Sequence, residues 1–152
     1  MHFDLTLARD RSKKNPVYYV QYAHARASGI LRKAKTKPNL AKIDWRKLES
    51  IPELSLIKYI LAFSEVFDET AEDFEVERLT RYAYELARAF TNFYETTPVI
   101  HPEGSRRMDP ERSRRIGVEK EIEKARLGLV VLTRRTLAHV LDILGVSAPE
   151  KM

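Results

Sequence analysis

Four histidines are the side chains best suited to metal binding in this chain. None of them takes part in the HExxH spacing that places two zinc ligands on one face of a helix. One of them, His24, lies on the apolar stripe of its predicted helix, so we interpret it as a core histidine. The sequence therefore predicts no metal site from His2, His24, His101 and His139.

Carboxylates and glycines offer the other routes to catalysis. We interpret the one acidic cluster as solvated charge at a helix N-terminus, where the helix dipole favours it, and not as a catalytic pair. The five glycines are isolated from one another, so the chain has no glycine-rich loop for the phosphates of ATP. The sequence predicts no catalytic residue. The acidic cluster consists of Asp68, Glu69, Glu72 and Asp73.

The net charge favours an acidic partner without requiring one. The formal charge is +5 and the pI is about 9.5, which attracts a polyanion if the charges share a face, although many basic domains bind no polyanion. Two interpretations of the basic clusters stay open, either weak contacts to a nucleic-acid backbone or solvated charge. The clusters are Lys33, Lys35 and Lys37, and then Arg106, Arg107, Arg112, Arg114 and Arg115.

The elements that must position these residues are helices. A chain of 152 residues with five glycines, rich in Leu, Ala, Glu, Arg and Lys, indicates one all-α domain. Because apolar helix faces must be buried against one another, we expect a compact helical bundle. Residues 1–14 would form a lead-in segment, and residues 97–118 a mobile basic loop with little apolar content. Caps and apolar periodicity predict helices over residues 15–35, 51–67, 75–96 and 119–144.

The composition also bears on the compartment. The chain has no cysteine, so it forms neither a disulfide framework nor a thiolate zinc site. It has no apolar run of about 18 residues, and its first residues lack the apolar core of a secretory signal. We therefore expect a cytoplasmic protein that does not enter a membrane.

Three separated blocks of the sequence resemble one family. Each resembles a block of the anticodon-binding domain at the C-terminal end of arginyl-tRNA synthetases, and the blocks follow one another in the family's order. FDLTLARDRS, near the N-terminus, resembles the stretch that leads into this domain from the catalytic core. The resemblance implies a helical bundle of the class I synthetase anticodon-binding type, with tRNA(Arg) as partner. The blocks are NPVYYVQYAHAR (15–26), RLTRYAYELARAFTNFYE (78–95) and ARLGLVVLTRRTLAHVLDILGVSAPEKM (125–152).

The resemblance also implies which residues read the anticodon. Arginine anticodons share a middle C, which must leave its stack to be read on aromatic rings. The family's first helix carries a tyrosine and an arginine four residues apart, and these fall on Tyr22 and Arg26. A second tyrosine falls on Tyr94, and the terminal methionine on Met152. Some members carry an aromatic residue four positions after the second tyrosine, where this chain has Pro98 instead of a stacking ring.

Signatures of the synthetase catalytic core, the HIGH-type and KMSKS-type motifs, are absent from this chain. ATP and arginine would therefore bind a catalytic core outside it, and we expect no cofactor, no aminoacylation by the chain alone, and a monomer. The terminal methionine suggests a native C-terminus. Whether the chain is an excised domain or a free-standing relative stays open.

Each site residue also has an ordinary structural interpretation. Tyr22 would be a boundary tyrosine with its ring in the core. Arg26 would be a solvated charge or the partner of a carboxylate on the last helix, and Met152 part of a frayed tail. At the level of function, the alternative is a helical interaction or RNA-binding module that kept the fold without a ligase core. The related domain of a cysteinyl-tRNA synthetase or another class I synthetase is a third candidate, and the block at 15–26 disfavours it.

Overall fold

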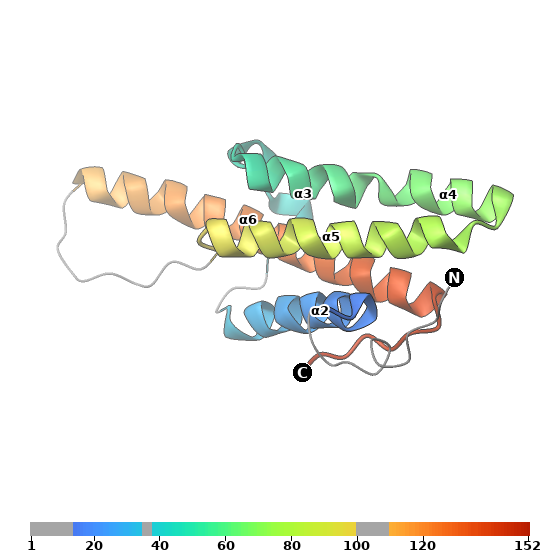
Figure 1. Cartoon of the computed structure of the whole chain (residues 1–152). Coiled ribbons are helices and arrows are strands. Elements are labelled where there is room, and N and C mark those ends of the chain that lie inside the picture. The colour runs from blue at the N-terminus through green and yellow to red at the C-terminus, as the bar shows by residue number, and fades with distance from the viewer. Residues whose placement is uncertain (1–13, 35–37, 100–109) are drawn as a thin grey trace.

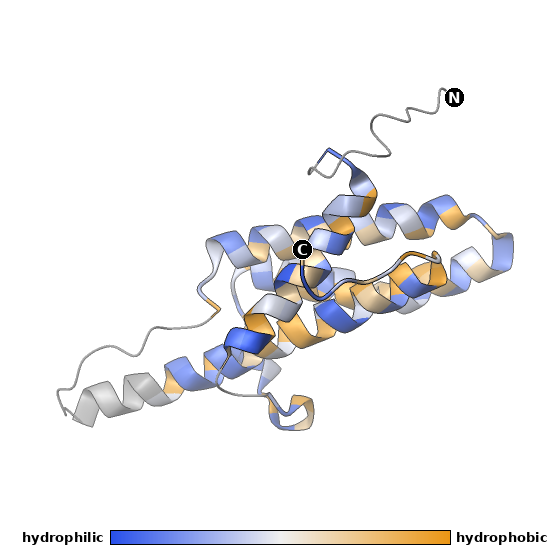
Figure 2. Cartoon of the chain, turned by 90° about the horizontal axis from the view of Figure 1, so that it is seen from below, coloured by the Kyte–Doolittle hydropathy of each residue, from blue (hydrophilic) through white to orange (hydrophobic). Residues whose placement is uncertain are grey.

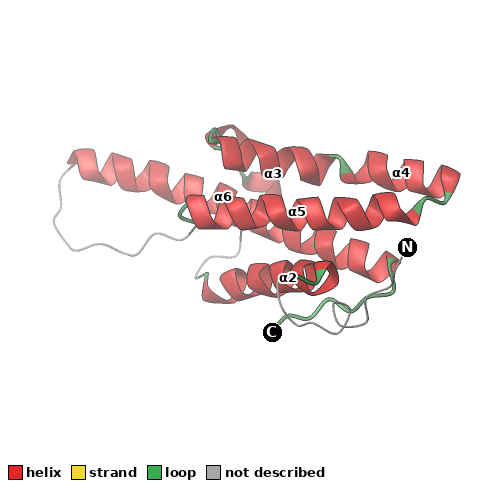
Figure 3. Ribbon diagram, in the orientation of Figure 1, coloured by secondary structure: helices red, strands yellow, loops and turns green. Residues whose placement is uncertain are grey.

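The structure, a computed structural model, describes residues 14–34, 38–99 and 110–152, with the backbone alone described at 110–116 (Figure 1). Within these ranges the chain is built of helices and connecting loops, with no β-strand (Figure 3). The predicted all-α class is confirmed. In chain order the elements are α2 (Pro16–Lys33), the 3₁₀ helices η1 (Leu40–Lys42) and η2 (Trp45–Lys47), α3 (Ile51–Leu61), α4 (Phe63–Asp73), α5 (Val76–Thr96) and α6 (Pro110–Ile143).

Helix α5 lies at the centre of the bundle. It contacts α2, α3, α4 and α6, and α6 in turn contacts α2, α3 and η2. In Figure 1, α3 and α4 follow each other along one side of α5, and α2 lies on the other side. Apolar residues recur between polar ones along these helices (Figure 2), as expected for helices that bury one face and expose another. None of the described helices offers an apolar stretch of the length needed to cross a bilayer.

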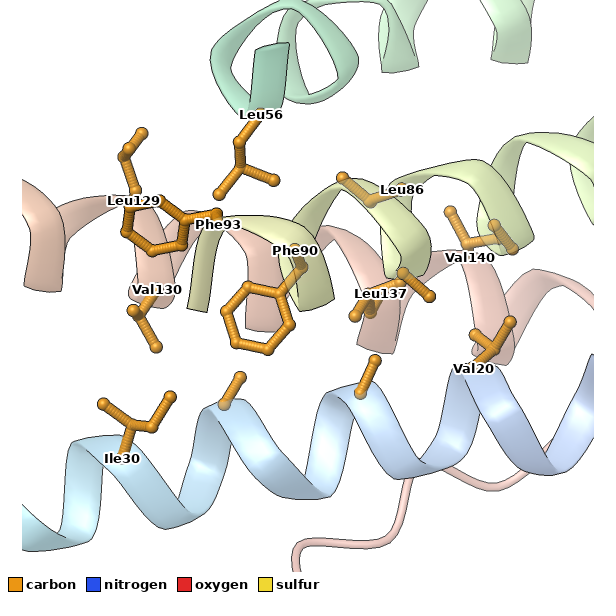
Figure 4. Packing of buried hydrophobic residues seen from close by; sticks show 14 of the residues in the cluster. Val20, Ile30, Leu56, Leu86, Phe90, Phe93, Leu129, Val130, Leu137 and Val140 are labelled. Carbon is orange, nitrogen blue, oxygen red and sulfur yellow. The ribbon is translucent and has the colours of Figure 1, made fainter. Parts of the chain in front are cut away.

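The core forms where α2, α3, α5 and α6 meet (Figure 4). On α5, large apolar residues recur every three or four positions and form one buried stripe. More than one face of α6 contributes buried residues, because this helix contacts α2, α3 and α5. The stripe on α5 consists of Leu79, Tyr82, Leu86, Phe90 and Phe93.

The start of α2 follows from its cap. The side-chain oxygen of Asn15 accepts hydrogen bonds from the backbone N–H groups of Val17 at 3.0 Å and Tyr18 at 3.4 Å. Pro16 occupies the first helical position, where its missing N–H costs nothing. The predicted start is therefore confirmed, although Val17, an apolar residue of the first turn, is half-exposed.

The predicted helix over residues 51–67 is two helices. The helix is interrupted at Ala62, and α4 then continues from Phe63 to Asp73. Neither proline nor glycine occurs at the joint, so the sequence carried no signal for it. Beyond the joint, the Phe63 ring lies 5.9 Å from the Tyr82 ring and 5.5 Å from the His139 ring.

The predicted basic loop at 97–118 is shorter than expected at both ends. Thr97 and Val99 are buried, and α6 begins at Pro110 instead of near residue 119. The first described side chains of α6, at 117–121, are exposed, so no apolar pattern marked this part of the helix. Arg112, Arg114 and Arg115 thus belong to a helix.

The acidic cluster lies at the opposite end of its helix from the one predicted. Asp73 is the last residue of α4, where the helix dipole disfavours a carboxylate. Arg78 of α5 offsets this charge, with its Nη2 2.7 Å from Asp73 Oδ2 and its Nε 3.4 Å from Glu69 Oε2. The hydrogen bond from Arg78 holds the pKa of Asp73 below its usual value. Through Arg78, two carboxylates of the cluster, Glu69 and Asp73, join α4 to α5.

Gly128 of α6 leaves room for the segment that contains η2. A Cβ atom at this position would lie 2.9 Å from Cη2 of Trp45, closer than van der Waals contact allows. We expect Gly128→Ala to lower the free energy of unfolding by about 1 to 2 kcal/mol, because overpacking outweighs the gain in helix propensity. Urea unfolding followed by circular dichroism measures the change.

Gly29→Ala, in α2, is the matched control for that substitution. A Cβ atom at residue 29 would meet only Arg32 Nη2, at 3.7 Å, so we expect a gain of about 0.5 to 1 kcal/mol. Stabilisation by both substitutions would contradict the placement of Trp45 against α6.

Candidate nucleic-acid interface

Tyr22 and Arg26 lie one turn apart on the same side of α2. The rotation of α2 is set by its buried residues, including Ala23 and Ala27, which belong to the core that α2 shares with α5 and α6. As a result Arg26 is exposed and Tyr22 is half-buried. The spacing of four residues predicted this shared face, and the structure confirms it.

Arg26 contacts the end of α5 through Tyr94. Its Nη2 donates a hydrogen bond of 2.7 Å to the Tyr94 hydroxyl, and its Cζ lies 4.4 Å from the centroid of the Tyr94 ring. The guanidinium is thus held over an aromatic face by a cation–π contact as well as a hydrogen bond. This contact, and not a carboxylate of α6, is the partner that the structure gives Arg26.

The segment after α6 turns back towards α2. Gly145 has a φ of +67°, the left-handed conformation that ends many helices. The Val146 N–H then donates to the Leu141 carbonyl at 2.8 Å, which closes the end of α6. The following residues run alongside α2 (Figures 1 and 2) and bring Met152, 53% exposed, beside it.

These side chains line one open pocket of about 460 Å³. The four residues predicted to read an anticodon are all at its wall, although they come from α2, α5 and the C-terminal segment. Four of the lining residues are cationic, and no lining side chain is acidic. The lining consists of Tyr22, Ala25, Arg26, Gly29, Ile30, Arg32, Lys33, Tyr94, Lys151 and Met152.

Arg32 and Lys151 are pocket residues that the sequence interpretation missed. Arg32 lies beside Lys33 in the basic last turn of α2, and Lys151 directly precedes Met152. Each lies one residue from a residue singled out in the sequence, Arg32 beside Lys33 and Lys151 beside Met152, and that proximity was the available signal. Pro98 follows the end of α5 and is no part of the pocket lining, and its carbonyl accepts a hydrogen bond of 2.8 Å from Arg126.

The other basic residues predicted as weak backbone contacts remain predictions. Lys35, Lys37, Arg106 and Arg107 lie outside the described residues, and only the helical backbone is described at Arg112, Arg114 and Arg115. His24, interpreted as a core histidine, is 3% exposed. Its burial confirms that interpretation.

The family follows from the sequence between α2 and the C-terminus. The model of the DALR anticodon binding domain matches residues 20–152. The chain belongs to the DALR anticodon-binding domain family. The resemblance of its three sequence blocks is thereby confirmed.

Relatives of this DALR domain carry the name arginine–tRNA ligase. Those of Bacillus pumilus and Moorella thermoacetica are each 44% identical to it over 156 aligned positions, which cover 100% of this chain and 25% of each relative. The chain thus spans about a quarter of the length of these relatives.

Solved structures give the same fold. The arginyl-tRNA synthetase of Thermus thermophilus matches with a TM-score of 0.68 and 33% identity, over 99% of this chain and 23% of that one. That of Plasmodium falciparum matches with a TM-score of 0.68 and 27% identity, over 95% of this chain and 22% of that one. The DALR domain is a helical bundle of the synthetase anticodon-binding type.

Proposed function

We propose that this DALR domain holds tRNA(Arg) by the anticodon loop, as part of an arginine–tRNA ligase. ATP and arginine would bind a catalytic core that this chain does not contain, and the domain itself would need no cofactor. The observation that carries the proposal is the gathering of Tyr22, Arg26, Tyr94 and Met152 around one pocket with a cationic rim. The proposal places the domain in the cytoplasm as a monomer, which sedimentation analysis checks.

The pocket suits an unstacked pyrimidine. A base can stack on an aromatic ring, which contributes about 1 to 3 kcal/mol per base. Arg26 has five N–H donors, and one of the two on Nη2 is directed to Tyr94, so others remain for the acceptor edge of cytosine. Because the Tyr94 oxygen accepts from Arg26, the hydroxyl hydrogen of Tyr94 can also donate to the base.

The rim suits the RNA backbone. Arg32, Lys33 and Lys151 add positive charge beside the base site, and cations of this kind position nucleic acid through its phosphates without reading sequence. If all three contact phosphates, the logarithm of the binding constant should fall with the logarithm of salt concentration with a slope of about −2.

The test is a titration with two RNA hairpins. One carries an arginine anticodon with its middle C, and the other differs only in that base. We expect the changed hairpin to bind more weakly by about 1 to 3 kcal/mol, by analogy with single-base discrimination in other complexes. Equal affinity for the two hairpins would show that the domain does not read the base.

The alternative is a helical interaction module without base reading. Its support is that three large apolar side chains, Ile51, Leu61 and Phe74, are exposed at the ends of α3 and α4. Unchanged RNA affinity in a folded variant that lacks both Tyr22 and Arg26 side chains would favour this alternative.

A further inference from the structure

The C-terminal segment is attached to α2 by side chains that bond its backbone. Gln21 Nε2 lies 2.9 Å from the Ser147 carbonyl oxygen, and Arg32 Nη1 lies 2.9 Å from that of Glu150. Between them, His24 Nδ1 lies 2.8 Å from the Pro149 carbonyl oxygen. The segment that ends at Met152 is thus fixed at three points along one helix.

Of these attachments, the one made by His24 is the most protected from water. The Gln21 and Arg32 bonds are exposed, whereas His24 is buried. A carbonyl oxygen only accepts, so Nδ1 must carry the hydrogen in this contact. Without this donor the partly buried hydrogen bond to the Pro149 carbonyl is lost, and a polar group left unsatisfied away from water costs free energy. The hydrogen bond from His24 therefore favours the position that the segment takes beside α2.

The attachment point is close in sequence to the pocket wall. His24 lies between Tyr22 and Arg26 along α2, and Pro149 precedes Lys151 and Met152 by two and three residues. Fixing Pro149 therefore fixes the start of the short stretch that carries two lining residues to the pocket. Arg134 of α6 adds a longer contact from the other side, 3.4 Å to the carboxylate of Glu150.

We infer that His24 is a positioning residue for base recognition, acting through Pro149 to hold Met152 at the anticodon pocket. The inference rests on the proposed function of that pocket. His24 itself would touch no base, because it is buried and absent from the pocket lining.

Three substitutions of His24 separate this role from mere filling of the core. In asparagine the amide nitrogen is bonded to Cγ, as Nδ1 is in histidine, so it can donate to the Pro149 carbonyl. In glutamine the amide nitrogen lies one bond further from the backbone. Leucine fills the space and donates nothing. We therefore expect His24→Asn to preserve the attachment, and His24→Leu and His24→Gln to lose it.

Methyl NMR of the chain labelled at its methionines reports the attachment directly. The chain has three methionines, Met1, Met108 and Met152, and Met152→Leu assigns the signal of the last. We expect His24→Leu and His24→Gln to shift and narrow the Met152 signal towards that of an unrestrained methionine, and His24→Asn to leave it close to wild type. An unchanged Met152 signal in folded His24→Leu, or in His24→Gln if the leucine variant does not fold, overturns the inference.

Titration of the same variants with the arginine anticodon hairpin tests the consequence for RNA. We expect a loss of affinity of about tenfold for His24→Leu and His24→Gln, the scale of one hydrogen bond, with His24→Asn close to wild type. A released Met152 signal with unchanged affinity overturns the positioning role. If the wild-type chain does not discriminate the hairpins, the proposed function fails, and the methyl signal alone decides whether His24 holds Met152.

Discussion

Glu53→Ala is expected to lower the free energy of unfolding by about 3 to 5 kcal/mol, the cost of removing one partner from a buried ion pair. Glu53 is 1% exposed. Its Oε1 lies 2.7 Å from Arg126 Nε, and its Oε2 accepts from the N–H groups of Glu49 at 3.0 Å and Ser50 at 2.8 Å. One side chain thus caps α3 and joins it to α6.

Urea unfolding measures this change, and Glu119→Ala is the control. Glu119 is an exposed glutamate of α6, and its loss should change stability by less than about 0.5 kcal/mol. A loss below about 1 kcal/mol for Glu53→Ala would show that the pair with Arg126 is effectively solvated.

Acid should remove the contribution that Glu53 makes to the free energy of unfolding. Burial alone would raise the pKa of Glu53, but the hydrogen bonds from the Ser50 backbone and from Arg126 outweigh it and hold the pKa below its usual value. Stability from Glu53 is therefore fully present above the pKa of an unfolded glutamate and is lost as the pH falls through the lower folded value. The difference in stability between wild type and Glu53→Gln should disappear over that window.

Replacing both Tyr22 and Arg26 with alanine is expected to weaken binding of the arginine anticodon hairpin by about 2 to 4 kcal/mol. The loss would combine a stacking ring with charge-assisted hydrogen bonds. Both side chains lie at the pocket, and Arg26 is exposed, so the domain should stay folded. Fluorescence titration measures the affinity, and circular dichroism checks the fold.

The chain offers a matched control in Tyr84 and Arg88. They are also a tyrosine and an arginine four residues apart, on α5, and both are exposed. Neither lines the pocket. Their double alanine variant should bind RNA with nearly wild-type affinity, and an equal loss in both double variants would mean that the pocket has no special role.

The sequence predicted best the elements with strong apolar periodicity. The helix α5 could be predicted because its large apolar residues from Leu79 to Phe93 recur every three or four positions, which places them all on one buried face. The joint at Ala62 could not be predicted, since neither proline nor glycine occurs there to mark the break between α3 and α4. The first turns of α6 were missed because a helix without an apolar face has no periodic signal.

In the site, too, the sequence could place residues of one helix relative to each other, but not residues that lie far apart along the chain. Tyr22 and Arg26 share a face because the helix repeat places them there. Tyr94 is 68 residues from Arg26 in sequence, and Met152 is further still, so no spacing rule joins them. Family resemblance supplied both residues, and the packing of α2 on α5 and the turn at Gly145 bring them to the pocket.

The most direct test of base reading combines the two RNA hairpins with two proteins, wild type and the double variant of Tyr22 and Arg26. If these side chains read the middle base, changing that base should weaken binding to wild type by about 1 to 3 kcal/mol and should hardly affect binding to the variant. The same cost of the base change in both proteins would show that the base is read elsewhere, and would contradict the account given for this pocket.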